Sequence, residues 1–140
     1  MSDFAAALNF VLARENGYVS DKADPGGETN FGISKRAYPQ LDIPNLTREQ
    51  AASIYESDYW RACHCETLDQ PAALALFDTA ANLGVERAMG LWQAAAGDVE
   101  ELLWARLAYY STLVHLARFL PSWLKRVLLL RRTIHAQGGP

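Results

Sequence analysis

Two carboxyl side chains lie close together in the sequence, one before a turn-rich segment and one inside it. Glu15 ends an apolar helical pattern over residues 4–15, and Asp24 belongs to the turn sequence Asp-Pro-Gly-Gly. The helix dipole and burial against core side chains such as Phe4 disfavour a negative charge at Glu15, so we expect it to stay protonated near neutral pH. Asp24, in the polar turn, should stay ionised. A carboxylic acid beside a carboxylate is what glycoside hydrolysis requires: one acid, and one base, nucleophile or stabiliser of charge.

Thr29 and Asn30 close the same segment, and their side chains could hold an attacking water. Taken alone, the pattern also fits simpler explanations, because a glutamate at a helix end is more often a surface charge than a catalyst. The Asp24-Pro-Gly-Gly27 stretch could be only a turn, and it lacks the spacing of an EF-hand calcium loop. The chain has no nucleophile elbow, P-loop or dinucleotide fingerprint. We therefore expect no metal and no cofactor.

Nearly all of the elements that must position these groups are predicted to be helical. Residues 17–33 are the exception, because turn-forming residues alternate there with aromatic and β-branched ones, which predicts a small hairpin or lobe. Apolar spacing and capping residues predict helices over 4–15, from Thr47 to about Ala62, from Asp69 to Gly84, on to Gly97, from Asp98 to Pro121 as the longest, and from Ser122 to just before Gly138. The predicted fold class is mainly α, a single domain over residues 1–140 with one glycine-rich lobe.

The length and composition favour one soluble domain. A chain of 140 residues, 50% hydrophobic and 21% charged, has room for one core and is not typical of a disordered protein. No apolar run approaches the roughly 20 residues of a membrane span. The first residues have no basic segment before Arg14 and so do not resemble a secretory signal. We expect a monomer that is made in the cytoplasm.

Five further polar or aromatic side chains have two interpretations each. Asp78 and Asn82 lie four residues apart on one helix face and could line a sugar cleft, although Asp78 could equally brace a neighbouring helix. Tyr18, Tyr59 and Trp60 could stack on sugar rings. At helical spacing, however, aromatic residues more often belong to the core than to a cleft.

The remaining tryptophans and the two cysteines are assigned structural roles. We expect Trp92, Trp104 and Trp123 in the core. Cys63 and Cys65 are separated by one residue, and so close a pair rarely meets the geometry of a disulfide. They are therefore predicted to be free thiols.

The charge is distributed unevenly, although the net charge is only −3. All 16 acidic residues lie in residues 1–101, whereas residues 102–140 hold six basic residues and no acid. A basic C-terminal segment of this kind is suited to binding a polyanionic surface. The predicted basic helix over residues 122–135 could lie on an anionic membrane or envelope surface through Lys125, Arg126 and Arg132. We favour packing of this helix on the domain with its bases outward, and we expect no nucleic-acid partner.

The order of short motifs resembles one known family. Glu15-Asn-Gly-Tyr18, Asp24-Pro-Gly-Gly27 and Thr29-Asn-Phe-Gly-Ile33 are similar to the signature of the glycoside hydrolase family 108 muramidases, once described as secretion activators. The likeness continues through Ile54-Tyr55, Tyr59-Trp60, Phe77-Asp78 with Asn82 and Gly84, Gln93, and Phe119 with Trp123 and Arg126. It therefore covers nearly the whole chain in the same order.

The resemblance implies a lysozyme-like fold that cleaves the bond between N-acetylmuramic acid and N-acetylglucosamine in peptidoglycan, with Glu15 matching the catalytic glutamate. The segment also resembles phage lysozymes, whose Glu is followed nine residues on by an Asp and six further on by a Thr. Asn30 occupies the threonine's place and Thr29 falls one residue short, so the water-holding role stays divided between them. We assign catalysis to Glu15, Asp24 and Thr29, and substrate binding to Asn30, Tyr18, Tyr59, Asp78 and Asn82.

The chain also departs from the family pattern. Asn16 stands where a glycine is usual, Ser122 replaces the glycine before the tryptophan, and an Asp-Gly-x-Ile-Gly-Pro-x-Thr segment linked to peptidoglycan binding is missing after Gln93. We expect a phage or prophage endolysin that reaches the wall once a partner opens the inner membrane. The alternatives are a non-catalytic wall-binding or secretion-helper protein that keeps the fold, and an antimicrobial that permeabilises membranes through its basic helix.

Overall fold

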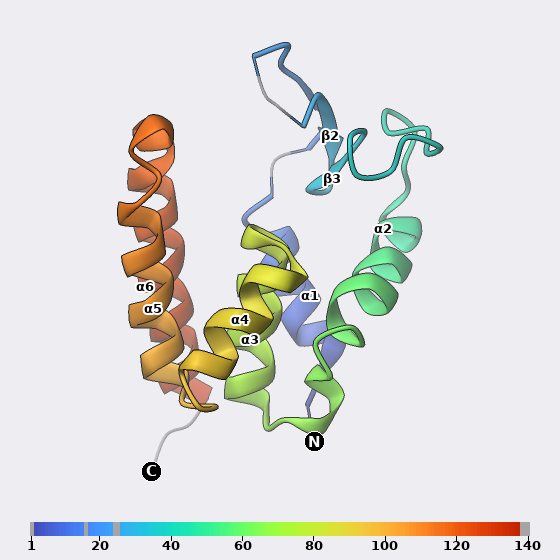
Figure 1. Ribbon diagram of the computed structural model, residues 1–140. Coiled ribbons are helices and arrows are strands. Elements are labelled where there is room, and N and C mark those ends of the chain that lie inside the picture. The colour runs from blue at the N-terminus through green and yellow to red at the C-terminus, as the bar shows by residue number, and fades with distance from the viewer. Residues whose placement is uncertain (1, 16, 24–25, 138–140) are drawn as a thin grey trace.

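Helix α3 (Gln70–Leu83) is the element on which the other helices pack. The computed structural model describes residues 2–15, 17–23 and 26–137. Every residue of α3 from Ala72 to Ala80 is buried, and α1, α4, α5 and α6 all contact this helix. Figure 1 shows α5 and α6 side by side on one side of α3 and α4, with α1 and α2 on the other. The predicted mainly α fold is confirmed.

The helical part contains these elements in chain order: α1 (Phe4–Leu12), α2 (Arg48–Tyr55), a π-helical turn η1 (Glu56–Trp60), a 3-10 turn η2 (Cys65–Thr67), α3, α4 (Val85–Ala94), α5 (Val99–Ser111), a 3-10 segment η3 (Val114–Phe119) and α6 (Leu120–Gln137). Among the described residues, no helix is both long and apolar enough to span a membrane. Cys63 and Cys65 are buried free thiols, as predicted.

A three-stranded antiparallel sheet forms the lobe that follows α1. Its strands are β1 (Val19–Ser20), β2 (Glu28–Asn30) and β3 (Ile33–Ser34), in that order across the sheet. Figure 1 shows the sheet beyond the end of α1, at one end of the helical part. The small lobe predicted for residues 17–33 is therefore confirmed over its described residues, and β3 extends it to Ser34.

Short polar side chains begin several helices, as their sequence positions predict. Thr47 and Gln50 form a reciprocal capping box at the start of α2. Asp69 accepts a hydrogen bond from the Ala72 N–H at the start of α3. Asp98 accepts one from the Glu101 N–H at the start of α5. Each cap satisfies a backbone N–H that has no partner within the helix.

Two predicted helix boundaries are wrong. The helix predicted from Asp98 to Pro121 ends at Ser111, and α6 already begins at Leu120, so α6 is longer than α5. Pro121 and Ser122 therefore lie in the first turn of α6, and Ser122 does not cap it. A proline is tolerated there because the first N–H groups of a helix have no intrahelical acceptor to lose.

Other predictions about the helices also need correction. The helix predicted to reach Ala62 is α-helical only to Tyr55 and continues as the π-helical turn η1. The prediction that Trp104 lies in the core is wrong, since this residue is 65% exposed and α5 turns Leu102, Leu103 and Arg106 inward instead. Trp92 and Trp123 are partly buried and pack against the core, as expected.

A buried ionic network joins α3, α5 and α6. The Asp78 carboxylate has no exposed surface and accepts hydrogen bonds from Arg106 Nη1 at 2.7 Å and from Arg126 Nε and Nη2 at 3.0 and 2.8 Å. Arg106 Nε also donates to the Tyr110 hydroxyl at 2.7 Å, and that hydroxyl donates to Asn82 Oδ1. Of the two interpretations of Asp78, the structure supports the brace between helices.

The basic face of α6 is only partly directed to solvent. Arg126 points inward to Asp78, which contradicts the expectation that the bases of this helix all face outward. Arg131 and His135 contact the Glu100 carboxylate at 3.0 and 2.7 Å, which joins the end of α6 to the start of α5. The helix therefore contributes a buried charge to the core as well as exposed ones to the surface.

Replacing Asp78 with asparagine should destabilise the fold strongly. The variant leaves the Arg106 guanidinium buried without its carboxylate partner, and breaking a buried ion pair from one side costs about 3–5 kcal/mol. Urea unfolding followed by circular dichroism measures the change in the free energy of unfolding. Glu100→Gln is the matched control, since it removes an exposed partner of Arg131 and should cost at most about 1 kcal/mol. Equal stability of the two variants would contradict the brace.

The same carboxylate should make stability depend on pH. Burial alone would raise the pKa of Asp78, but the guanidinium groups of Arg106 and Arg126 outweigh burial and hold this pKa below its ordinary value of 3.8. A group whose pKa is depressed in the folded state contributes stability above its unfolded pKa and loses it as the pH falls through the folded pKa. The free energy of unfolding should therefore fall as the pH drops below about 4, and less steeply in Asp78→Asn.

Candidate active site

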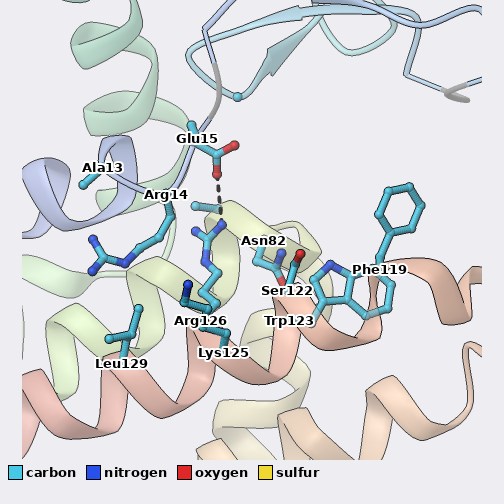
Figure 2. Close-up of a pocket in the computed structure, with 12 residues that line it drawn as sticks. Ala13, Arg14, Glu15, Asn82, Phe119, Ser122, Trp123, Lys125, Arg126 and Leu129 are labelled. Carbon is cyan, nitrogen blue, oxygen red and sulfur yellow. Dashed lines mark hydrogen bonds and ion pairs between the residues drawn. The ribbon is translucent and has the colours of Figure 1, made fainter.

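Glu15 lies just past the end of α1 and faces the C-terminal helix. Two backbone hydrogen bonds continue the turn past the end of α1 as far as Glu15. The Arg14 N–H donates to the Val11 carbonyl at 3.0 Å, and the Glu15 N–H donates to the Leu12 carbonyl at 3.3 Å. The Glu15 side chain is 22% exposed. Its Oε1 accepts a hydrogen bond from Arg126 Nη1 at 3.0 Å, which Figure 2 shows as a dashed line.

The contact with Arg126 changes the setting that the sequence predicts for Glu15. An apolar surrounding was expected, whereas the carboxyl has a guanidinium as its partner. Burial alone would lower the pKa of Arg126, but the carboxylates of Asp78 and Glu15 raise it above its ordinary value, so the guanidinium stays charged. Arg126 is itself held by two bonds to Asp78, so the direction of the Glu15 carboxyl depends on the buried network.

A tight turn in the sheet lobe lies directly against Glu15. Asn30 pairs with Ile33, so Phe31 and Gly32 form a two-residue hairpin turn, and both have positive φ, at 52° and 77°. Turns of this kind match the twist of antiparallel strands, and positive φ favours glycine. The Tyr55 hydroxyl donates to the Phe31 carbonyl at 2.8 Å and holds the turn in place.

Gly32 is also required by the space around it. A Cβ atom at this position would lie 2.5 Å from the Tyr55 hydroxyl oxygen and 2.8 Å from Glu15 Cδ. Both separations are shorter than any normal contact, so the bare backbone of this glycine allows the turn to approach the carboxyl.

Two adjoining hollows meet at this point. The larger hollow, of about 620 Å³, lies toward α6, and its lining includes Arg14, Asn82, Phe119, Trp123, Lys125 and Arg126. The smaller hollow, of about 390 Å³, lies toward the sheet, and its lining includes Val19, Asp21, Thr29 and Arg118. Glu15, Gly32 and Phe119 line both. A carboxyl at the junction of two hollows can reach a bond in a chain that occupies both.

The alternation of side chains along the strands decides which polar groups face the smaller hollow. Thr29 pairs with Val19, and both line the hollow together with Asp21, which lies two residues after Val19. Thr29 and its cross-strand partner Val19 point to the same face of the sheet, and the next residue, Asn30, points to the opposite face. Of the two candidates for holding a water, Thr29 is therefore the one beside Glu15.

Tyr18 and Asn30 lie outside both hollows, which does not support their predicted contact with substrate. Tyr18 is 47% exposed, and its hydroxyl donates to Glu28 Oε2 at 2.7 Å on the other face of the sheet. Asn30 is buried, and its Nδ2 donates to the Ile43 carbonyl at 3.1 Å. Asn30 thus fastens the sheet to the loop before α2.

The other predicted site residues divide between the hollows and the core. Asn82 lines the larger hollow, and its Oδ1 already accepts a hydrogen bond from the Tyr110 hydroxyl. Asp78 is fully buried behind Arg126, and Tyr59 is partly buried beside Tyr55, with ring centroids 5.2 Å apart. Neither of them is among the lining residues of the two hollows. Asp24 lies outside the residues that the structure describes.

Several residues that line the two hollows are not identified as site residues by the sequence. Besides Glu15, Asp21 is the carboxyl that the described structure places in the smaller hollow, and it lies directly after β1. Arg118 and Arg126 come from the far end of the chain, and no local pattern connects them with Glu15. Within the described ranges, no three side chains of the metal-binding types gather into a group that could hold an ion.

Residues 8–84 match the family model described as glycosyl hydrolase 108. The match covers more than half of the chain and includes the sheet lobe and the Phe31–Gly32 turn. The chain belongs to this family. The resemblance found in the motifs is thereby confirmed, and with it the class of glycoside hydrolases that act on peptidoglycan.

The solved structure of SagA from Brucella abortus agrees over nearly the full length of this family member. The two chains superpose with a TM-score of 0.85 and 28% sequence identity, and the match covers 95% of this chain and 94% of SagA. No curated protein matches the chain. The similarity to SagA includes α5 and α6, which lie beyond the family match and supply Arg126.

Replacing Gly32 with alanine should destabilise this glycosyl hydrolase by at least about 1–2 kcal/mol, the cost of a left-handed residue with a side chain. The added methyl also meets Tyr55 and Glu15, so the turn must move. Thermal unfolding monitored by circular dichroism gives the difference. Gly90→Ala is the control, because a Cβ there meets nothing within 4 Å and the residue lies inside helix α4. A Gly32→Ala protein as stable as Gly90→Ala would contradict the close approach.

Proposed function

We propose that this protein is a muramidase that cleaves the bond between N-acetylmuramic acid and N-acetylglucosamine in peptidoglycan, with Glu15 as the acid catalyst. The observation that carries the proposal is the place of Glu15 at the junction of the two hollows. Membership of the glycosyl hydrolase 108 family supplies the reaction class. The position of Glu15 in the motif Glu15-Asn-Gly-Tyr18, which resembles the motif of the family's catalytic glutamate, supports its role.

The geometry suggests how the acid works. A glycan that occupies both hollows passes Glu15 and meets Phe119 and Trp123 on the α6 side, where both residues line the larger hollow. Arg126 binds Glu15 Oε1, so we assign the proton to Oε2, which would donate it to the glycosidic oxygen as the bond breaks. Once the proton has left, the carboxylate faces the guanidinium of Arg126, which stabilises its charge.

A second polar group must act on the sugar from the sheet side. Thr29 faces the smaller hollow with Glu15 and is suited to hold the attacking water through its hydroxyl. The second carboxyl is Asp24 according to its spacing from Glu15, whereas Asp21 is the carboxyl that shares the hollow. Either one would stabilise positive charge on the sugar or activate the water.

Glu15→Gln should abolish lytic activity and leave the fold intact. The amide cannot donate a proton in place of the acid, and loss of a general acid removes roughly 10² to 10⁴ in rate. Mass spectrometry of purified peptidoglycan after digestion identifies the products, and muropeptides with reducing N-acetylmuramic acid ends should come from the wild type only.

The matched control is Glu28→Gln, the same chemical change on the other face of the sheet, where Glu28 contacts Tyr18. This variant should keep full turnover. Unchanged turnover in Glu15→Gln would rule out Glu15 as the acid. Binding to the wall without any product from the wild type would instead favour a non-catalytic wall-binding protein.

Three substitutions in the same assay distinguish the roles of the groups proposed to act together with Glu15. Thr29→Val keeps the β-branched shape and removes the hydroxyl, so kcat should fall by about tenfold or more. Of Asp21→Asn and Asp24→Asn, the one that removes the acting carboxylate should lose at least about 100-fold in kcat, and the other should stay near the wild type. Full activity in all three variants would contradict a mechanism with a second group on the sheet side.

A phage or prophage endolysin is the biological setting that we propose for this activity. Such a protein is made in the cytoplasm and reaches peptidoglycan after a partner opens the inner membrane. Expression in bacterial cells should therefore cause lysis only when the inner membrane is permeabilised, and lysis without permeabilisation would contradict this setting. Direct permeabilisation by α6 has less support, because Arg126 is buried and Arg131 and His135 are bound to Glu100.

A further inference from the structure

The larger hollow carries more positive charge than its own side chains neutralise. Its lining holds three cations, Arg14, Lys125 and Arg126, and Glu15 as the acid. Arg126 is already held by side chains of the protein, because its guanidinium contacts the buried Asp78 carboxylate and also Glu15. The charges of Arg14 and Lys125 are therefore the surplus, and among the described residues neither forms a salt bridge with an acid.

Arg14 is held in position without being neutralised. Its Nη1 donates to the Phe10 carbonyl at 2.8 Å, and its guanidinium carbon lies 3.8 Å from the centre of the Phe10 ring. A carbonyl and a ring face stabilise a guanidinium but add no opposite charge. Its Nε is buried and has no hydrogen-bond partner among the described residues. A buried N–H without an acceptor is costly, and an acceptor group of a bound ligand would relieve this cost.

The opposite side of the same hollow has a different chemistry. Figure 2 shows Arg14 on one side of Arg126, and Asn82, Trp123 and Phe119 on the other. An amide and two aromatic rings suit the hydroxyl groups and apolar faces of a sugar. The hollow thus has a side suited to neutral sugar and a cationic side, and Glu15 lies at its boundary with the smaller hollow.

We propose that Arg14 and Lys125 form a subsite for a carboxylate of the substrate, carried by the peptide stem on N-acetylmuramic acid. The inference rests on the proposed function, since it takes peptidoglycan as the ligand. The sugars of the intact polymer are neutral because the lactyl group is joined to the peptide by an amide, so the negative charge lies on the carboxylates of the stem. Arg14 directly precedes Glu15, so the subsite adjoins the bond that would be cleaved.

The test measures binding apart from catalysis. Isothermal titration of the Glu15→Gln protein is carried out with three ligands: a peptidoglycan tetrasaccharide with its peptides, the same tetrasaccharide after an amidase has removed them, and neutral chitotetraose. Mass spectrometry verifies that each ligand stays intact. Adding Lys125→Gln should weaken binding of the peptide-bearing ligand by about three- to fivefold, the range of an exposed ion pair, and leave the Kd for chitotetraose unchanged.

Arg132→Gln in the same background is the matched control. It removes one positive charge from the same exposed helix, but Arg132 is not among the residues that line the hollow. It should leave all three affinities unchanged. Arg14→Gln should reproduce the effect of Lys125→Gln, and circular dichroism checks its fold because Arg14 packs on Phe10.

The peptide-free tetrasaccharide distinguishes the two sources of a carboxylate. A loss confined to the peptide-bearing ligand supports the stem, whereas an equal loss with the peptide-free ligand assigns the subsite to the lactyl carboxylate that the amidase exposes. Equal losses for chitotetraose, equal losses in Arg132→Gln, or no binding of any ligand would overturn the subsite. Failure of the muramidase proposal is seen separately, in the product analysis of the wild type.

Discussion

The site depends on one buried carboxylate held between two guanidinium groups. Asp78 on α3 contacts Arg106 on α5 and Arg126 on α6, with no exposed surface of its own. Removing such charges from water costs several kcal/mol for each ion, and only close pairing offsets this cost, so the three helices must hold these side chains within contact distance. That arrangement also sets the direction of Arg126, and Arg126 in turn binds Glu15.

The network explains how residues from the two ends of the chain build one site. Glu15 and Arg126 are 111 positions apart, yet their side chains meet because α1 and α6 both pack on α3. The hollows exist because the sheet lobe and α6 lie on different sides of Glu15. In this chain only residues 95–98 separate α4 from α5, so the connection where the family's usual segment is missing is short.

The sheet lobe determines which side chains lie beside Glu15. Phe31 and Gly32 have positive φ and form a tight turn. The turn can approach Glu15 only because Gly32 has no side chain. The same turn fixes the register of β2, and the register fixes which side chains face the hollow. A shift of one residue would exchange Thr29 for Asn30 beside the acid, which is why the spacing of the motif alone left that choice open.

Local sequence determined the helices and their starts, the glycine-rich lobe and the candidate acid. Capping at Thr47, Asp69 and Asp98 depends on neighbouring residues only, and Glu15 belongs to a motif that is contiguous in the chain. The end of α5 and the start of α6 were not predictable in this way, because a proline fits a helix start as well as it ends one. Tertiary structure alone decided that Asp78 is a brace, that Thr29 rather than Asn30 faces the acid, and that Arg126 pairs with Glu15, because each depends on packing between segments far apart in the sequence.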